Sequence, residues 1–279
     1  MRYQIDHDLH IHTCLSRCAQ DMHQRPDRIL EYGLENNLHT LCITDHFWDE
    51  NVPGVKFGME GGAFNGYATQ TCAHIKLALP LPQAEGVRYL FGCETEMAVD
   101  HTIGVSRKTA EELDFIIVPT THMHMRNLAA RDPEDNTEAR RAEMWVERFQ
   151  AVLDSGLPLK KVGIPHLTTA LFVPDKTWAG VERCLSLISD DDMKHLFGQA
   201  AKAGVGIELN FEPFKCARIM ESVLRPYKIA IECGCKFYLG SDAHTVGMLN
   251  KAMADFEKMI DLLDLTEDQK YIVPRKEEL

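Results

Sequence analysis

The sequence lacks any long run of uncharged apolar residues. A membrane-spanning helix needs about 20 such residues, and no apolar stretch in this 279-residue chain approaches that length. The first residues, MRYQIDHDLHIHT, also lack the basic segment and the apolar stretch of a secretory signal. We therefore expect a cytoplasmic protein that does not interact with membranes.

Cysteine pairs at the spacing of a zinc ribbon or a redox motif are absent as well. The nine cysteines are scattered along the chain, and an odd number cannot be used up by intramolecular disulfides. We expect reduced thiols, including Cys233 and Cys235 at a turn between a helix and a strand.

Positive charge is in deficit, because 42 acidic residues face 30 basic ones and give a formal charge of −12. This balance disfavours attraction to long nucleic acids or to anionic membranes. The expected partner is therefore a small phosphorylated substrate, while the oligomeric state stays open. Bound divalent ions would reverse the charge locally at carboxylates that ligate them.

Short apolar runs alternate with amphipathic stretches along the chain. This alternation is typical of a parallel sheet wrapped by helices, whose strands are covered on both faces. The seven expected strands are 4–12, 40–46, 88–98, 115–122, 160–166, 205–211 and 236–244. The expected helices are 26–37, 64–79, 137–155, 190–203, 217–233 and 246–263.

Residues at the predicted helix ends support these boundaries. Pro26 suits a first helical turn, Asp190 is the expected N-cap of its helix, and Gly204 follows a last turn. The glycine-rich stretch 48–66 has no clear periodicity and predicts a long loop. Since no linker or internal repeat divides the sequence, we expect one domain over residues 1–279.

Every expected strand carries histidine or carboxylate residues at or near its carboxyl end. In chain order they are His10 and His12, Asp45 and His46, Glu94 and Glu96, His122 and His124, His166, Glu208, and Asp242 and His244. Residues two apart in a strand face the same side, so the first and the last pair each project together. A parallel barrel brings the carboxyl ends of its strands to one rim, and the sequence therefore predicts a metal site there.

The residue types indicate which metals this site would bind. Imidazole nitrogen combined with carboxylate oxygen suits divalent Zn, Mn or Fe, whereas Mg or Ca prefers mostly oxygen. Eight or nine ligands exceed what one tetrahedral ion uses, so we expect two or three divalent ions that share a carboxylate, for which Glu94 is our choice. Two such ions about 3.5–4 Å apart can bind a phosphate oxygen and hold a hydroxide in line for attack.

These motifs resemble the PHP family, named for polymerase and histidinol phosphatase. The similarity extends over essentially the whole chain, through D-L-H-I-H-T at 8–13, I-T-D-H at 43–46, G-C-E at 92–94, T-T-H at 120–122, I-P-H at 164–166 and G-S-D-A-H at 240–244. The resemblance implies an α/β fold, a distorted seven-stranded (β/α)7 TIM-like barrel, with a trinuclear metal centre. The metal ligands that it implies are His10, His12, His46, Glu94, His122, His166, Asp242 and His244.

One further ligand is expected in the loop after the first motif. Members of the PHP family have Asp or His there, and this loop offers Asp21, with suitable chemistry, or Cys18, at the more usual spacing. Loop length varies more easily than strand length, so we expect Asp21 to bind metal, with Cys18 as the alternative. The competing structural interpretation is that Asp21 caps the helix that follows it, although Pro26 marks the start of that helix several residues later.

Several residues receive further roles. The expected catalytic residues are Glu94, His122, Asp242 and His244. The expected outer partners, which orient ligands, are Asp45, Glu96 and Glu208. His124 either joins the ligands and the proton transfers or lies outside them. Arg17 and Arg126 are candidates for bidentate binding of a substrate phosphate.

The leading hypothesis for function is a phosphoric ester hydrolase. Its substrate would be a small phosphomonoester, such as histidinol phosphate or a nucleotide, cleaved by a metal-bound hydroxide. A phosphodiesterase or exonuclease acting on short nucleic acid is one alternative, and an amidohydrolase-type C–N hydrolase is another. The latter class often has a carbamylated lysine at a central strand end, and no lysine occupies such a position here. A metal-binding regulatory domain without catalysis is disfavoured by the nearly complete ligand set.

Overall fold

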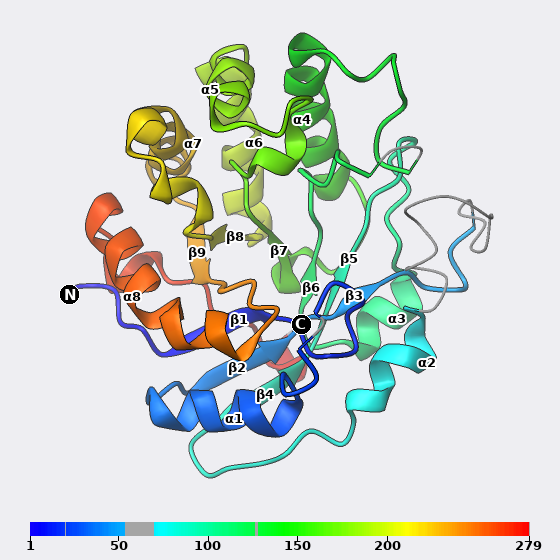
Figure 1. Ribbon diagram of the computed structural model, residues 1–279, viewed down its shortest axis with the longest axis vertical. Coiled ribbons are helices and arrows are strands. Elements are labelled where there is room, and N and C mark those ends of the chain that lie inside the picture. The colour runs from blue at the N-terminus through cyan, green and yellow to red at the C-terminus, as the bar shows by residue number, and fades with distance from the viewer. Residues whose placement is uncertain (20, 54–69, 126–127, 279) are drawn as a thin grey trace.

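The computed structural model describes residues 1–19, 21–53, 70–125 and 128–278 (Figure 1). Its strands are short and form two sheets in which all neighbouring strands run parallel. The three-stranded sheet has the order β1 (His7–Ile11), β2 (Thr40–Ile43), β4 (Arg88–Phe91). The six-stranded sheet has the order β3 (His46–Phe47), β5 (Cys93–Thr95), β6 (Ile116–Ile117), β7 (Val162–Ile164), β8 (Gly206–Leu209), β9 (Lys236–Leu239).

Two chain segments run from the three-stranded sheet into the six-stranded one. Two residues separate β2 from β3, and Gly92 alone separates β4 from β5. Gly92 permits this second transition, because a β-carbon there would lie 2.5 Å from the carbonyl oxygen of Phe115. On the other side, a parallel bridge between Ile11 and Ala243 joins the end of β1 to the residues after β9.

The expected parallel α/β architecture is confirmed, and the arrangement is compatible with a TIM-like barrel. The hydrogen-bond ladders, however, form two sheets rather than one closed ring among the described residues. Each of the seven predicted runs contains a strand, and two of them are broken: 40–46 contains β2 and the first residue of β3, and 88–98 contains β4 and β5. At the first of these breaks, Thr44 and Asp45 accept hydrogen bonds from the backbone of Ile11 and Thr13 with their side chains.

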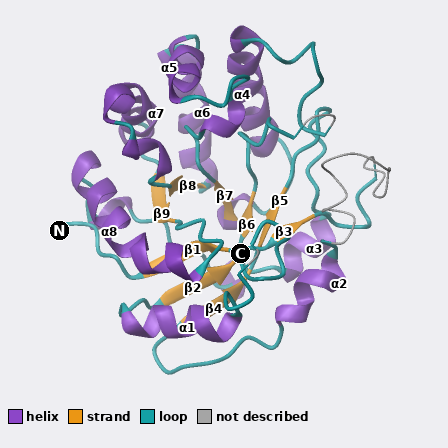
Figure 2. Cartoon of the chain, viewed as in Figure 1, coloured by secondary structure: helices purple, strands orange, loops and turns teal. Residues whose placement is uncertain are grey.

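The helices lie around the outside of the strands (Figure 2). They are α1 (Pro26–Glu35), α2 (Cys72–Ile75), α3 (Arg107–Glu112), α4 (Glu138–Leu153), α5 (Trp178–Ser186), α6 (Asp190–Ala203), α7 (Met220–Glu232) and α8 (Val246–Leu263). Over the ranges that the structure describes, none of them combines the length and apolar character needed to cross a membrane.

Four predicted helices, now α1, α4, α6 and α8, agree with the structure to within a few residues. The predicted helix 217–233 begins as a 3-10 turn, Ala217–Ile219, and continues as α7. The predicted helix 64–79 lies partly outside the described residues. Its described part, 70–79, contains α2. The predicted loop 48–66 also lies mostly outside the described residues. The short helices α3 and α5 were not predicted from the sequence.

Helix caps explain several boundaries. Ser189, rather than the predicted Asp190, caps α6, because the Ser189 hydroxyl accepts the backbone N–H of Asp192 at 3.0 Å. Asp190 is instead the first helical residue, where its negative charge still interacts favourably with the helix dipole. Gly204, with φ of 77°, ends α6 in the left-handed conformation as predicted. Pro26 occupies the first turn of α1, also as predicted.

A buried hydrophobic cluster joins the two sheets. It consists of Leu9, Cys42 and Leu90 from β1, β2 and β4, Ile117 and Tyr238 from β6 and β9, and Phe115, Tyr271 and Val273. Complete burial of a large apolar side chain contributes about 1.5–3 kcal/mol, so this shared packing fixes the sheets relative to each other. The carboxyl ends of both sets of strands are thereby held around the same space.

Candidate metal centre

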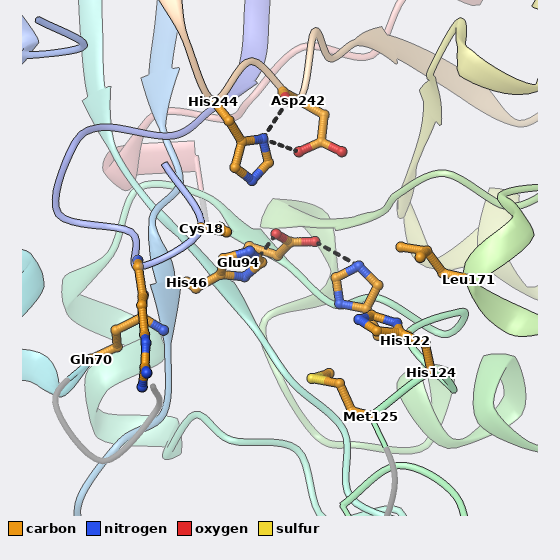
Figure 3. Close-up of a pocket in the computed structure, with 11 residues that line it drawn as sticks. Cys18, His46, Gln70, Glu94, His122, His124, Met125, Leu171, Asp242 and His244 are labelled. Carbon is orange, nitrogen blue, oxygen red and sulfur yellow. Dashed lines mark hydrogen bonds and ion pairs between the residues drawn. The ribbon is translucent and has the colours of Figure 1, made fainter. Parts of the chain in front are cut away.

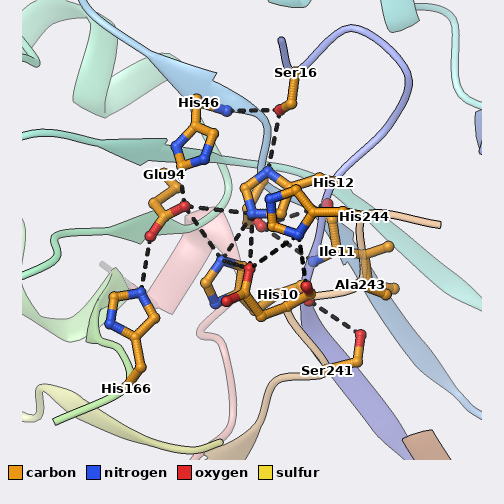
Figure 4. A network of polar contacts seen from close by, with 12 residues as sticks. His10, Ile11, His12, Ser16, His46, Glu94, His166, Ser241, Ala243 and His244 are labelled. Atoms are coloured by element: carbon orange, nitrogen blue, oxygen red, sulfur yellow. Dashed lines mark hydrogen bonds and ion pairs between the residues drawn. The ribbon is translucent and has the colours of Figure 1, made fainter. Parts of the chain in front are cut away.

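The strand ends bring eight of the nine predicted ligands together. Figure 4 labels His10, His12, His46, Glu94, His166 and His244 among them. His10 lies in β1, His46 begins β3, and Glu94 is the central residue of β5. The remaining members follow strands β1, β6, β7 and β9 and are His12, His122, His166, Asp242 and His244. Figure 4 shows side chains from both sheets pointing toward one another in this cluster.

The cluster contains three groups whose ligand atoms lie within 4.8 Å of one another. The first group is His10, His12, Glu94 and Asp242; the second is Glu94, His122 and His166; the third is His12, His46 and His244. Each group mixes imidazoles with carboxylates or consists of imidazoles alone, which suits a divalent transition metal or zinc. The described residues can thus hold a metal ion at more than one place.

Glu94 faces two of these groups with different oxygens. Its Oε2 lies 3.4 Å from Nε2 of His10 and 3.3 Å from Nε2 of His12. Its Oε1 lies 3.2 Å from Nε2 of His166 and 3.8 Å from Nε2 of His122. Glu94 could therefore offer one oxygen to each of the two groups.

Outer carboxylates fix the orientation of the imidazoles. Glu208 lies 2.5 Å from Nδ1 of His10 and also accepts the backbone N–H of His166 at 2.8 Å. Glu96 lies 3.0 Å from Nδ1 of His122. Such partners set the tautomer and leave Nε2 of each ring for a metal. The sequence analysis placed both glutamates in this role, and the structure agrees.

Hydroxyl groups complete the orientation. The Ser16 hydroxyl lies 3.1 Å from Nδ1 of His12 and donates to Asp45 at 2.7 Å, so Asp45 acts through Ser16 as an outer partner. The Thr121 hydroxyl lies 2.9 Å from Nδ1 of His166. Neither hydroxyl was identified from the sequence, although each lies within or just after a motif that carries a ligand.

Two members of the cluster have unusual backbone conformations. His166 has φ of 31° and Asp242 has φ of 50°, in the left-handed region that residues other than glycine seldom adopt. Conformations of this kind cost roughly 1–3 kcal/mol and are concentrated at functional sites. The rest of the fold must therefore stabilise these two backbone conformations, which hold the side chains of His166 and Asp242 in the cluster.

Opposite charges within the cluster shift its pKa values. Burial disfavours the imidazolium of His12, but hydrogen bonds to two carboxylates raise its pKa to about 9. Burial also opposes the charge on His10, yet nearby carboxylates, Glu208 foremost, raise its pKa well above the usual range. Burial would raise the pKa of Glu94, but the surrounding histidines, His46 foremost, lower it well below the usual range. The cluster therefore favours positive charge, which a divalent ion supplies.

We expect Zn to stabilise the protein increasingly as the pH rises from about 6.5 to about 9. The pKa of His12 is about 9 in the folded protein, compared with an ordinary value of 6.5. The proton on His12 therefore stabilises the metal-free fold fully below pH 6.5, and this stabilisation is lost as the pH rises through 9. A metal binds neutral imidazole, and its apparent affinity grows over the same interval. Thermal unfolding with and without Zn measures the difference in Tm, which should widen with pH. A difference that is constant or shrinks would contradict the prediction.

Asp21 does not join the cluster. Its Oδ1 accepts the backbone N–H of His23 at 3.0 Å, and its Oδ2 accepts that of Val246 at 3.1 Å. Val246 is the first residue of α8, so Asp21 accepts an N–H group of the first turn of the helix that follows Asp242 and His244, whose N-cap is Thr245. The competing interpretation, that Asp21 caps the next helix along the chain, is not what the structure shows, because among the described residues α1 has no side-chain cap.

Cys18, the alternative, lines the cavity above the cluster together with Glu94 and Asp242. Cys18 is exposed, and desolvation by the surrounding atoms, followed by the charges of these two carboxylates, raises the pKa of its thiol to about 12. In the residues that the structure describes, neither Cys18 nor Asp21 belongs to a group of ligand atoms.

We expect Asp21→Ala to keep the full metal content while lowering Tm slightly, because it removes the acceptors for the N–H groups of His23 and Val246 and leaves the Thr245 cap of α8 in place. Cys18→Ser provides the parallel variant at the alternative position. Elemental analysis after purification without chelator measures the metal content of both proteins. Loss of one equivalent in Asp21→Ala would show that the prediction of Asp21 as a ligand was right and that the loop rearranges when metal binds.

A cavity of about 480 Å³ opens above the cluster (Figure 3). The cluster residues that reach it are His46, Glu94, His122, Asp242 and His244. Arg17 and Gln70 line one side, and Arg17 donates its backbone N–H to Oε1 of Gln70 at 2.7 Å. Met125 and Leu171 also line the cavity and give it apolar surface. The position of Arg17 suits its predicted role, whereas Arg126 lies outside the described residues.

His124 also lines this cavity, and its ring contacts that of His122 edge-on with centroids 5.2 Å apart. Its Nδ1 is buried without a hydrogen-bond partner among the described residues. Burial, then the charge of His122, lowers its pKa to about 3. His124 is therefore neutral at pH 7 and can form a hydrogen bond with a ligand, but it is not a member of the three groups.

No family model and no curated protein sequence matches this chain. Among solved structures it is similar to histidinol phosphate phosphatase from Lactococcus lactis subsp. lactis, with a TM-score of 0.53 and 15% identity over 91% of this chain and 94% of that chain. It is also similar to A. niger ochratoxinase, with a TM-score of 0.44 and 10% identity over 94% and 67% of the two chains. A triazine hydrolase variant gives a TM-score of 0.39 and 14% identity over 88% and 60%. The first similarity shows a shared fold.

Proposed function

We propose that this protein is a metal-dependent phosphatase of the PHP type that hydrolyses a small phosphate monoester. The observation that carries the proposal is Glu94, whose two oxygens face different groups of ligands at the base of a cavity. The donors fit two or three ions of Zn, Mn or Fe. Such ions supply Lewis acidity to a phosphoryl group and acidify water when they are bound.

The residues of the chain would hold and orient the substrate. Arg17 is exposed and lines the cavity, so its guanidinium can bind phosphate oxygens next to the cluster. Met125 and Leu171 would contact the alcohol portion, and the neutral imidazole of His124 can form a hydrogen bond with it. His122, Asp242 and His244 would act as ligands whose outer partners prevent rotation.

The size and charge of the cavity favour a metabolite over a polymer. A volume of about 480 Å³ is in the range of small-molecule sites, which span roughly 300–1,000 Å³. The formal charge of −12 disfavours a long polyanion. Histidinol phosphate is the first compound to test, because the structure with the shared fold is a histidinol phosphate phosphatase that contains zinc, L-histidinol and phosphate. Nucleotides are the second class.

The cluster argues against a lysine-bridged C–N hydrolase. In the described part of the chain, no lysine lines the cavity above the cluster, and Glu94 takes the shared position. The buried Lys161 donates to the backbone carbonyls of Leu113 and Glu111 and is engaged there. The proposed chemistry is therefore ester hydrolysis, and cleavage of a diester or an amide is an outcome for the experiment.

A substrate panel tests the function. Phosphate monoesters, including histidinol phosphate and nucleotides, are compared with bis(p-nitrophenyl) phosphate and with amide substrates, with Zn, Mn and Fe added separately. We expect the highest kcat/KM for a monoester and dependence on added metal. Preferential turnover of the diester or of an amide, or turnover that is independent of metal, would contradict the proposal.

A further inference from the structure

Helix α4 presents three buried donors along one face. Arg141, Trp145 and Arg148 are 5%, 0% and 0% exposed, and their spacing of four and three residues places them on the same side of the helix. All three side chains donate hydrogen bonds to backbone carbonyl oxygens outside the helix. The acceptors belong to segments that carry members of the metal-binding cluster.

Arg148 makes the most of these contacts. It donates to the carbonyls of Thr120 at 2.9 Å and Met97 at 3.0 Å. Longer contacts of 3.4–3.5 Å reach Pro119, Ala98 and Ala129. Met97 directly follows Glu96, and Thr120 precedes His122 by two residues. One guanidinium thus ties the segment after β5 to the segment after β6.

Arg141 and Trp145 extend the pattern to the next positions. Nη1 of Arg141 donates to the carbonyl of Met123 at 2.5 Å, and Met123 directly follows His122. The indole N–H of Trp145 donates to the carbonyl of Leu167 at 3.0 Å, and Leu167 directly follows His166 with its left-handed backbone. The loops of both histidines in the group Glu94, His122 and His166 are therefore attached to one rigid helix.

Arginine has a specific advantage at position 148. A buried cation without an ion pair is costly, and none of the described carboxylates forms a salt bridge with Arg148. Its planar guanidinium carries five N–H donors in fixed directions, whereas the ammonium of lysine is a point charge on a flexible stem. Arginine can therefore serve more carbonyls of separate segments, in fixed directions, than lysine can from one buried position, and this would explain an arginine here.

We propose that α4 positions the metal group Glu94, His122 and His166, with Arg148 as the main positioning residue and Arg141 and Trp145 as its supports. The inference rests on the proposed metal centre but not on the identity of the substrate. The carbonyls that accept from α4 lie beside Glu96, His122 and His166. His122 and His166 belong to this group alone, whereas Glu94 is shared with the group that contains His10, so the effect should be largest at this group.

The test uses Arg148→Lys, with Arg225→Lys as the matched control. Arg225 on α7 also donates to two backbone carbonyls, those of Leu185 and Ile188, but these lie away from the metal centre. Metal-free proteins are titrated with Zn in competition with a chromophoric chelator. We expect Arg148→Lys to lower the affinity for one equivalent of Zn by about 10–100-fold, which is the range for loss of an outer partner of a ligand. The affinity for the other equivalents should change less, and the control should bind as the unmodified protein does.

Retention of all equivalents at unchanged affinity would overturn the proposal, and so would equal weakening of every equivalent. If Arg148→Lys does not fold, Trp145→Phe serves instead, because it keeps an aromatic ring at this buried position and removes the donor to Leu167. The affinity for the same equivalent of Zn should then fall by a smaller factor, and unchanged Zn binding would contradict the proposal. Since the readout is metal affinity, its failure is distinct from a failure to find phosphatase activity.

Discussion

Glu94→Gln should lose on the order of a thousandfold in turnover while the protein stays folded. Loss of an outer partner of a ligand already costs about 10–100-fold, and Glu94 is the residue shared by two ligand groups. A glutamine amide offers one neutral oxygen and an N–H₂ group, so it cannot supply two anionic oxygens. The charge that balances the neighbouring histidines would also be lost. The expected result is therefore a fall in kcat rather than a change in KM alone.

Glu221→Gln is the control for this variant, because Glu221 is an exposed carboxylate on α7. It should keep normal turnover and metal content. Far-UV circular dichroism and thermal unfolding show whether Glu94→Gln retains its fold, and elemental analysis shows which equivalents of metal it loses. Normal turnover in folded Glu94→Gln would exclude Glu94 as a bridge, whatever the substrate.

The cluster could be predicted because strand geometry is local. His10 and His12 are two residues apart in an extended segment, as are Asp242 and His244, so alternation alone points each pair to one side. The rule that parallel strands share a carboxyl edge then unites residues more than 200 positions apart. Eight of the predicted ligands lie together in the structure for this reason.

The loop position could not be predicted in the same way. The loop after β1 has no periodicity, and nothing in the sequence shows that Asp21 meets the backbone of Val246, 225 residues later. The contacts of Glu208 with His10 and of Arg148 with Met97 are likewise tertiary. The strand breaks also depend on close approaches, such as that of Gly92 to Phe115. Sequence patterns specify which face a residue occupies, but they do not specify its partner.

Removal of metal should have the largest effect of all. Protein purified without chelator should contain more than one equivalent of Zn, Mn or Fe, because the ligand set exceeds the needs of one ion. After dialysis against a chelator, we expect turnover to fall below about 1% of its original value, since Lewis acidity and the acidification of water are both lost. Readdition of one metal at a time should restore it, which also identifies the metals that support activity.

The same treatment should lower Tm. An ion that binds only the folded state at a free concentration 1,000 times its Kd stabilises that state by about 4 kcal/mol, and for a chain of this size each 1 kcal/mol shifts Tm by roughly 2–4 °C. The metal-free fold should nevertheless persist, because protons on His10 and His12 compensate for part of the missing positive charge. Added Ca is the control, since a cluster rich in imidazole discriminates against it. Metal-free protein with full turnover would refute the metal centre, whereas loss of turnover that Ca restores would refute the assignment to Zn, Mn or Fe.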